Sequence, residues 1–501
     1  MRHTLNMYRW NFLPSLTLFV SFSFLTFGGV TAAVGQGSER ANPWQASAVV
    51  KPNVLLILAD DMGYADIGCH GSTQIPTPNI DALAQDGVLC TQAYVSGAVC
   101  SPSRAGILTG RYQQRFGWEH NFAFNPHVIP EYKAVPKDER MIPQYLRPAG
   151  YATAIIGKWH LGLRDIKWQH PLGRGFDYYF GRYGGHGHFP KAEDRNILRG
   201  FDPVTEIEVP YTTDWYTKEA IDFIDRTPAD TPWFLYLSHD TPHTPLQAKQ
   251  DDIARFSHIK DEKRRVYAAM QHCLDENIGR LVKHLKDTDQ YDQTLIVFFS
   301  DNGGAVTANA SLNSPLWGMK GILYEGGIRV PMIFSWPDGL PSGVTYKQPL
   351  ITLDLLPTLL SAAGIERTRV EHTKRKLDGV NLLPYLRGEF GDRRPHQTMY
   401  WRIAQKGAAV RDGDLKLIRT PFKLPMLFDL GSDVSEQSDL ASQQPDKVDE
   451  LMRKLNDWEL TLDATPVILE SVKWQRDSRK KYEAPYETDQ PIRSTVEVSQ
   501  R

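Results

Sequence analysis

The sequence predicts an α/β fold, with a central mixed and largely parallel sheet flanked by helices and a small C-terminal subdomain with an antiparallel sheet. Two continuous apolar runs, Asn53–Ala59 and Thr294–Ser300, have the composition of strands that are buried on both faces of a parallel sheet. A helical stretch at Lys263–Lys286 leads into the second run. From about Pro384 the pattern changes to the alternation that is typical of antiparallel strands, as at Leu415–Arg419.

Composition places the chain among ordinary globular proteins. It has 501 residues, of which 23% are charged, and a formal net charge of −2. This length suits one large domain and a smaller one, and the charge gives no indication of nucleic acid binding. The expected parts are a signal peptide at 1–33, a large catalytic domain at 49–384, a C-terminal α+β subdomain at 385–473 and a charged tail at 474–501.

The remaining elements alternate between strand and helix. In the large domain we expect strands at Gly150–Ile156, Trp233–Ser238 and Met332–Pro337, and helices at Tyr216–Arg226 and Ile351–Ala363. In the C-terminal part we expect strands at Thr398–Ile403, Ala408–Arg411 and Met426–Leu430, and a helix at Asp446–Leu460. The stretch Asp165–Pro210 is expected to be irregular.

The N-terminal pattern predicts an exported protein. Arg2, His3 and Arg9 precede the apolar run Phe12–Val30, which ends in small residues up to Ala33. This is the pattern of a secretory signal peptide, and it indicates a periplasmic or secreted location. A membrane anchor is the alternative, but serines and glycines dilute the run, so we expect no stable membrane insertion after cleavage.

The cysteines do not form a dense disulfide framework. The chain has four of them: Cys69, Cys90, Cys100 and Cys273. The fold is therefore expected to depend on its apolar core rather than on disulfides. Pairing of Cys69 with Cys90 stays open.

Acidic residues directly follow the two most apolar strands. Asp60 and Asp61 come after the first run, and Asp301 and Asn302 come after the second. Ligands of open α/β sheets bind at the carboxyl ends of strands, so these side chains are expected to converge. Three carboxylates and an amide carbonyl favour a hard cation, and Ca²⁺ is favoured over Mg²⁺ because it tolerates ligands gathered from distant strands. Without a cation the acids would repel one another; surface acids in a solvated turn are the alternative for Asp60 and Asp61.

Basic and histidine side chains follow two other predicted strands. Lys158 and His160 come shortly after Gly150–Ile156, and with Trp159 turned to the other side both would point at the same strand edge. His243 lies between two prolines after Trp233–Ser238, and rigid flanks suit a positioned acid. Solvated surface side chains are the alternative.

Two further histidines, His186 and His188, lie in a glycine-rich loop. They can bind metal or substrate, but histidines in such a loop are more often solvated. We therefore leave them outside the predicted site.

The most specific stretch is Cys100-Ser101-Pro102-Ser103-Arg104. Apolar residues after it predict the inward face of a short helix, which places Cys100 at the helix N-terminus. That end of a helix binds anions, and Arg104, one turn on, adds a permanent charge. A small buried cysteine at a helix start is the alternative.

This stretch resembles, residue by residue, the C-x-P-x-R signature of the type I, formylglycine-dependent sulfatases, an arylsulfatase-like family of the alkaline phosphatase superfamily. The resemblance extends over most of the chain after the predicted signal peptide. Other segments that carry it are Met62–Gly68, Thr77–Ala84, Gly157–Gly162, Trp317–Gly321 and Glu325–Pro331.

The resemblance implies an alkaline-phosphatase-like sandwich and a modified nucleophile. Cys100 would be oxidised to Cα-formylglycine (3-oxoalanine) by a formylglycine-generating maturation enzyme, and the hydrated aldehyde would attack sulfur. Attack by a thiol would leave a stable thiosulfate ester, whereas the hydrate can expel sulfate by collapsing to the aldehyde. The catalytic residues that the resemblance implies are Cys100, Arg104, Lys158, His160, His243, Asp301 and Lys320. The implied metal ligands are Asp60, Asp61, Cys100, Asp301 and Asn302.

The implied function is hydrolysis of a sulfate ester on a sulfated carbohydrate or an aryl sulfate. One alternative is a phosphoester or phosphonate monoester hydrolase of the same superfamily. The other is an unconverted protein that only binds sulfated glycans. No segment identifies which sulfate ester is cleaved.

Overall fold

The computed structural model describes residues 51–121, 130, 133–185, 187–365, 375–421 and 423–462, which all belong to one compact unit. The predicted signal peptide and charged tail lie outside these residues, so both stay predictions. Within the described ranges, no helix has the length and apolar composition needed to cross a membrane.

A large mixed sheet runs through the molecule. Within the described chain it has 11 strands in the order β10-β2-β9-β8-β1-β7-β3-β4-β5-β6, with β11 paired to β2. The central strands β8, β1, β7, β3 and β4 are parallel, whereas β9 pairs antiparallel with β2 and β8. The bounds are β1 (Asn53–Ala59), β2 (Val88–Tyr94), β3 (Ala152–Lys158), β4 (Tyr178–Arg182), β5 (Leu198–Arg199), β6 (Asp202–Pro203), β7 (Trp233–Ser238), β8 (Thr294–Ser300), β9 (Arg329–Ser335), β10 (Val344–Tyr346) and β11 (Leu350–Ile351).

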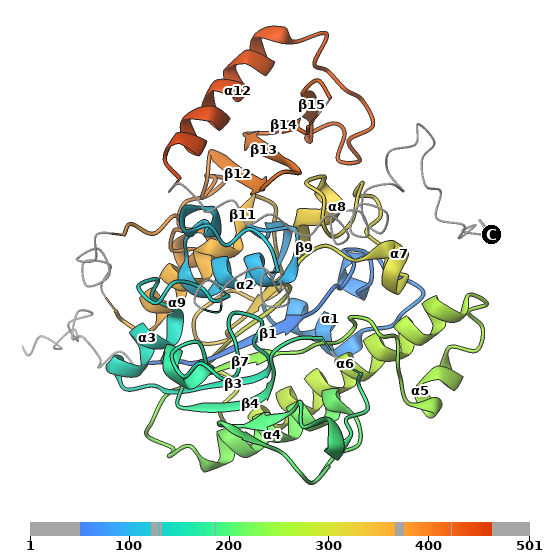
Figure 1. Ribbon diagram of the computed structural model, residues 1–501, viewed down its shortest axis with the longest axis vertical. Helices are drawn as coiled ribbons and strands as arrows, with labels where there is room; N and C mark the ends of the chain where they lie inside the picture. The colour runs from blue at the N-terminus through green and yellow to red at the C-terminus, as the bar shows by residue number, and fades with distance from the viewer. Residues whose placement is uncertain are drawn as a thin grey trace, which may run out of the picture. The chain divides into compact units, whose positions relative to one another are not determined.

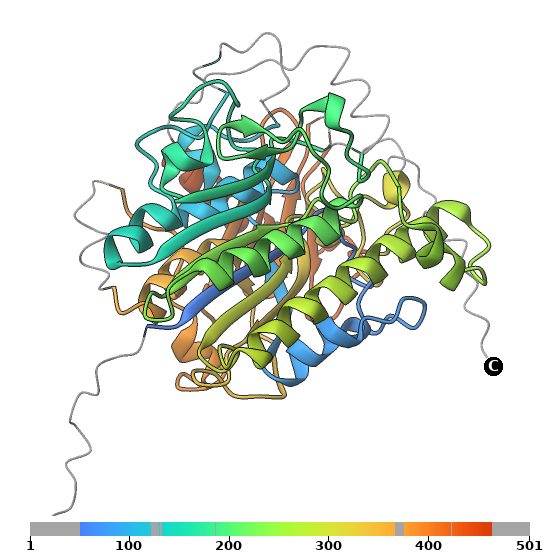
Figure 2. The same ribbon diagram turned by 90° about the horizontal axis from the view of Figure 1, so that it is seen from below.

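Helices cover both faces of this sheet. Side chains of β1 alternate between two cores: Leu56 and its neighbours pack with α2, α3 and α9, while Leu55 and Ile57 pack with α1, α4 and α6. Figure 2 shows α1, α4 and α6 side by side across one face. The helix bounds are α1 (Pro78–Gln85), α2 (Cys100–Thr109), α3 (Ile142–Leu146), α4 (Thr212–Arg226), α5 (Gln250–Arg255), α6 (Glu262–Asp287), α7 (Val306–Asn309), α8 (Glu325–Ile328), α9 (Leu355–Ala362), α11 (Leu383–Leu386) and α12 (Pro445–Leu460).

A second, antiparallel sheet forms the C-terminal part of the described chain, next to α12 (Figure 1). Its strands pair in sequence order and are β12 (Thr398–Ile403), β13 (Gly407–Asp412), β14 (Leu415–Arg419) and β15 (Met426–Asp429). Leu451, Leu455 and Trp458 of α12 share one apolar core with this sheet and with Val95 and Ile328 of the large domain. The predicted α/β fold with a small antiparallel subdomain is confirmed.

Two predictions of local structure are wrong. The stretch expected to be irregular contains β4, a five-residue strand with Gly181 inside it, which is too short and too poor in apolar β-branched residues to identify from pattern. The helix expected from Ile351 begins only at Leu355. The chain turns before it, because the Asp354 carboxylate accepts hydrogen bonds from the backbone N–H groups of Ile351 (3.0 Å) and Val380 (2.8 Å).

Each of the four cysteines is a free thiol, so Cys69 and Cys90 do not pair. A buried ionic network instead ties the small sheet to the large domain. The ammonium of Lys416, on β14, lies 2.9 Å from a carboxylate oxygen of Glu325, on α8, and 2.9 Å from one of Glu436. Glu436 also accepts the backbone N–H of Glu325 (2.7 Å). Burial raises the pKa of Glu436 to about 7, with Lys416 opposing the shift and Glu325 adding to it.

Removing Lys416 should therefore destabilise the whole protein. Lys416→Ala removes the cation that two buried carboxylates share and leaves Glu325 with the longer ion pair to Arg329, at 3.5 Å, which costs about 3–5 kcal/mol in the free energy of unfolding, measured by urea denaturation. The matched control is Lys454→Ala, which removes a partly exposed ion pair with Asp412 (2.5 Å) and should cost less than about 1 kcal/mol. Equal losses of unfolding free energy in the two variants would contradict the stabilising role of Lys416 in the buried network.

Candidate active site

The carboxyl ends of the parallel central strands meet at one edge of the sheet and carry the predicted site residues. Asp60 and Asp61 follow β1, Lys158 ends β3, and Asp301 and Asn302 follow β8. Each of these side chains is buried. The strand register therefore brings together residues that are more than 200 positions apart in sequence, such as Asp61 and Asp301.

Cys100 is the first residue of α2, as predicted, and is buried. Its Sγ lies 3.4 Å from Asp60 Oδ1, 3.9 Å from Asp61 Oδ1 and 3.1 Å from Lys320 Nζ. Burial raises the pKa of the Cys100 thiol, and the neighbouring carboxylates of Asp301 and Asp60 raise it further. The residue is therefore held as a protonated thiol, which is a poor nucleophile.

Arg104, one helical turn after Cys100, is buried at the centre of the site. Its Nε donates to Asp301 Oδ2 (3.0 Å), and its Nη2 lies 2.9 Å from the same oxygen and 3.3 Å from Asp60 Oδ2. Its Nη1 donates to the carbonyl of Lys158 (3.1 Å) and to the hydroxyl of Ser238. One guanidinium thus connects the ends of β1, β3, β7 and β8.

Two lysines complete the charge balance. Lys158 Nζ lies 2.5 Å from Asp60 Oδ2, and Lys320 Nζ lies 2.6 Å from Asp61 Oδ1. Burial raises the pKa of Asp60, but the cationic neighbours, Lys158 first, more than reverse this and hold it well below its usual range. The pKa of Asp61 is lowered in the same way, chiefly by Lys320. Three carboxylates are therefore neutralised by three cations of the chain itself, which the sequence did not predict.

The pKa of Asp301 is shifted in the opposite direction from those of Asp60 and Asp61. Burial raises its pKa to about 6 and the Asp60 carboxylate adds to the shift, while Arg104 opposes it. Its Oδ1 accepts the backbone N–H of Asp61 (3.2 Å). A carboxyl group with a pKa near neutrality can both take and return a proton, which is what a general base requires.

The residues fit a divalent cation. Asn302 donates from Nδ2 to Asp61 Oδ1 (2.8 Å), and its buried Oδ1 has no hydrogen-bond partner in the described part of the protein. A buried carbonyl oxygen without a donor, next to carboxylates, suits a hard cation. Asp60, Asp61, Cys100 and His243 also present possible ligand atoms that all lie within 4.8 Å of one another.

His243 is the most exposed of the predicted site side chains, at 22%. Its Nε2 lies 3.5 Å from Asp61 Oδ2, and its Nδ1 lies 2.5 Å from the carbonyl oxygen of Thr244. Because a carbonyl can only accept, Nδ1 carries a proton and Nε2 is the atom free to exchange one. Burial lowers the pKa of His243, opposed by Asp61 and Asp60.

His160 is buried in the same region, and its backbone has φ +60°. Its carbonyl accepts a hydrogen bond from the Ser101 hydroxyl (2.6 Å), which ties it to α2. Burial lowers the pKa of His160 well below its usual value, and the cations Lys158 and Arg104 lower it further. Its ring is therefore a neutral base.

The prediction that both loop histidines are solvated is wrong for His188, whereas His186 lies outside the described residues. His188 is 1% exposed, and its Nε2 lies 2.9 Å from the carbonyl oxygen of His243. Its Nδ1 lies 3.5 Å from Asp240 Oδ1, and the other oxygen of Asp240 pairs with Arg182 (2.7 Å). This buried chain supports the backbone of His243. The glycine-rich pattern gave no signal of it, because Arg182 lies in the unpredicted strand β4.

The fold and the site define an α/β protein with a buried, charge-balanced site at the carboxyl edge of its sheet. The chain matches the Sulfatase family model over residues 52–365 and the C-terminal model of N-sulphoglucosamine sulphohydrolase over residues 316–461. It therefore belongs to the sulfatase family and is a sulfuric ester hydrolase.

Relatives support this assignment. N-acetylgalactosamine-6-sulfatase of Sus scrofa is 33% identical over 453 residues, covering 80% of this chain and 84% of the relative. The crystal structure of Ps i-CgsB in complex with k-i-k-neocarrahexaose has 36% identity and a TM-score of 0.77, covering 86% of this chain and 97% of that one. Phosphonate monoester hydrolase of Agrobacterium radiobacter, at 21% identity and a TM-score of 0.60, shares the fold alone.

Proposed function

We propose that this sulfatase hydrolyses sulfate esters of carbohydrates, with residue 100 as the nucleophile after conversion of Cys100 to Cα-formylglycine. The observation that carries the proposal is the position of Cys100. It lies at the N-terminus of α2, within 3.1 Å of a lysine and 3.4 Å of a carboxylate, inside the C-x-P-x-R signature. As a buried protonated thiol it suits a precursor better than a nucleophile.

The carbohydrate substrate rests on what the relatives bind or are named for. Curated relatives are named for a 6-sulfate of N-acetylgalactosamine, and Ps i-CgsB was crystallised with an oligosaccharide, neocarrahexaose. Both are sugars. We therefore place a sulfated sugar ahead of an aryl sulfate as the substrate of this chain.

The maturation enzyme would oxidise Cys100 to the aldehyde, whose hydrate supplies a hydroxyl nucleophile that can later release sulfate by returning to the aldehyde. Asp301 would take the proton of that hydroxyl: its charge acts on the side chain of residue 100, and burial raises its pKa to about 6, near neutrality. Arg104 fixes the Asp301 carboxylate in position through two contacts. The ammonium groups of Lys158 and Lys320, which Asp60 and Asp61 hold in the site, would stabilise the charge on the sulfate oxygens, a preorganised electrostatic contribution.

The two histidines would complete the proton transfers. His243, partly exposed at the site, would protonate the leaving alcohol from Nε2 in its imidazolium form, which the nearby Asp61 and Asp60 carboxylates favour. His160, a buried neutral base, would deprotonate the remaining hydroxyl of residue 100 and so release sulfate. Asp60, Asp61, Asp301 and Asn302 with residue 100 would hold Ca²⁺, which would add positive charge against the sulfate oxygens. Asp60, Asp61 and Cys100 belong to the cluster of possible ligand atoms, and Asn302 offers its unpartnered Oδ1.

The modification at position 100 tests the proposal directly. In protein from a host with the maturation enzyme, peptide mass spectrometry should show an aldehyde in place of the Cys100 thiol. Cys100→Ala should lower turnover by roughly 10⁵-fold or more, since the nucleophile is lost, while the far-UV circular dichroism spectrum stays unchanged. Active enzyme that contains only unmodified cysteine would exclude the mechanism.

The role of His243 is tested by varying the leaving group. His243→Ala should lower kcat for a sugar sulfate by about 10²–10⁴-fold, because a sugar hydroxyl leaves only when it is protonated. The same variant should lose less than about tenfold on 4-nitrophenyl sulfate, whose leaving group needs little protonation. The exposed His258→Ala serves as the control and should not change either rate. Equal losses on both esters would reassign His243 to sulfate binding.

The metal assignment is tested by chelation and readdition. Because three cations already balance the three acids, we expect the fold to survive chelation with a lower melting temperature and lost activity, both restored by Ca²⁺ and less well by Mg²⁺. At a concentration 100 times Kd the cation contributes about 2.7 kcal/mol of stability. Asp61→Ala should abolish Ca²⁺ binding in calorimetry; wild-type affinity in this variant would disprove the site.

A further inference from the structure

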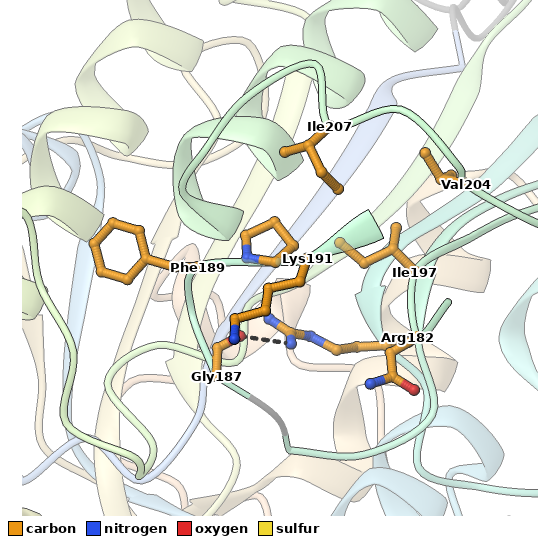
Figure 3. A pocket seen from close by; sticks show the side chains of 9 residues that line it. Arg182, Gly187, Phe189, Lys191, Ile197, Val204 and Ile207 are labelled. Carbon is orange, nitrogen blue, oxygen red and sulfur yellow. Dashed lines mark hydrogen bonds between the residues drawn. The ribbon is translucent and has the colours of Figure 1, made fainter. Parts of the chain in front are cut away.

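A cavity of about 280 Å³ lies over the end of β4, between the segments that contain Gly187 and Ile197. Its lining has two kinds of surface, as Figure 3 shows: Val204 and Ile207 lie on the opposite side of the cavity from Gly187. Its volume is near the lower end of the range for ligand sites, roughly 300–1,000 Å³, which suits one sugar ring.

The lining is amphipathic. Phe189, which is 42% exposed, and the aliphatic side chains of Ile197, Val204 and Ile207 supply apolar surface. The Phe189 ring is held edge-on against Tyr211, with ring centroids 5.0 Å apart. A sugar ring has an apolar C–H face and a polar hydroxyl edge, so it matches a lining that combines an aromatic ring and aliphatic side chains with polar groups.

The polar side of the cavity carries one available positive charge. Arg182 lines it, but its guanidinium already pairs with Asp240 (2.7 Å) and donates to Tyr216 (3.0 Å) and to the Gly187 carbonyl (2.9 Å). Lys191 is exposed and has no ion pair among the described residues, and no acidic residue is part of the lining. The ammonium of Lys191 is therefore free to bind an anionic group.

One segment that lines the cavity also contacts the active site. Gly187 lines the cavity, and the next residue, His188, contacts the His243 backbone at 2.9 Å. Gly185 lies close to the His243 ring: a Cβ added at Gly185 would lie 3.3 Å from that ring. A wall segment of the cavity is thus linked through His188 to the backbone of the residue to which we assign protonation of the leaving sugar.

We propose that this cavity is a subsite for a second sugar ring of a sulfated oligosaccharide, with the apolar face of that ring on Phe189 and an anionic substituent at Lys191. The inference rests on the proposed function, because it concerns the sugar that lies next to the ring carrying the cleaved ester. It predicts that the protein prefers an oligosaccharide over a sulfated monosaccharide.

The test is binding of k-i-k-neocarrahexaose by isothermal titration calorimetry, together with hydrolysis of 4-nitrophenyl sulfate, which has no second ring. Phe189→Ala should weaken hexasaccharide binding roughly tenfold. Lys191→Ala should weaken it roughly threefold to tenfold, with a smaller effect at high salt, and Lys191→Arg should restore it. Hydrolysis of the aryl ester should stay within about twofold of wild type in all three variants, since the small ester makes no contact with the subsite.

Two exposed residues outside the cavity serve as matched controls. Phe390→Ala removes an aromatic side chain of similar exposure, 39%, and Lys260→Ala removes an exposed lysine. Neither should change hexasaccharide affinity.

The outcomes separate the two proposals. Wild-type affinity in Phe189→Ala and Lys191→Ala, or no hexasaccharide binding by the wild type, overturns the subsite. If the hexasaccharide binds and both variants weaken it, the subsite stands even when the wild type hydrolyses no sulfated sugar. Binding without hydrolysis of any sulfated sugar would instead contradict the carbohydrate substrate of the proposed function.

Discussion

The site depends on one constraint, the charge balance among six side chains buried at the carboxyl edge of the central strands. Three carboxylates and three cations lie there within contact distance, and burying any one of them alone would cost several kcal/mol. Arg104 contributes most to this balance, because its planar guanidinium reaches two carboxylates, a carbonyl and a hydroxyl at once. A lysine at this position could not make the same contacts.

This arrangement requires the parallel sheet and the helices on both of its faces. The strands β1, β7, β8 and β3 must run in the same direction for Asp60, Lys158 and Asp301 to meet at one edge. Their apolar side chains alternate between two helix-covered cores, which exclude water from beneath the charges. The N-terminus of α2 then brings Cys100 to the same edge, where the positive end of the helix dipole favours an anion.

The small C-terminal sheet has a part in the site as well. Glu325, which Lys416 of that sheet binds, begins α8, and Lys320 lies only five residues before it. The N–H of Lys320 donates to the carbonyl of Gly304 (3.2 Å), two residues after Asn302. Gly303 must be a glycine, because an added Cβ would lie 1.9 Å from the Gly326 carbonyl oxygen. The buried network of the subdomain thus supports the segment that delivers Lys320.

The sequence by itself determined the strands with continuous apolar runs, such as Asn53–Ala59 and Thr294–Ser300, and the start of the helix at Cys100, because these depend on local pattern. It also placed the charged residues at strand ends. Only the tertiary structure decided which charges pair, that Asn302 turns its nitrogen to Asp61, and that His188 supports His243. Such contacts join residues as far apart as Asp61 and Lys320, 259 positions in sequence, and no local pattern encodes them.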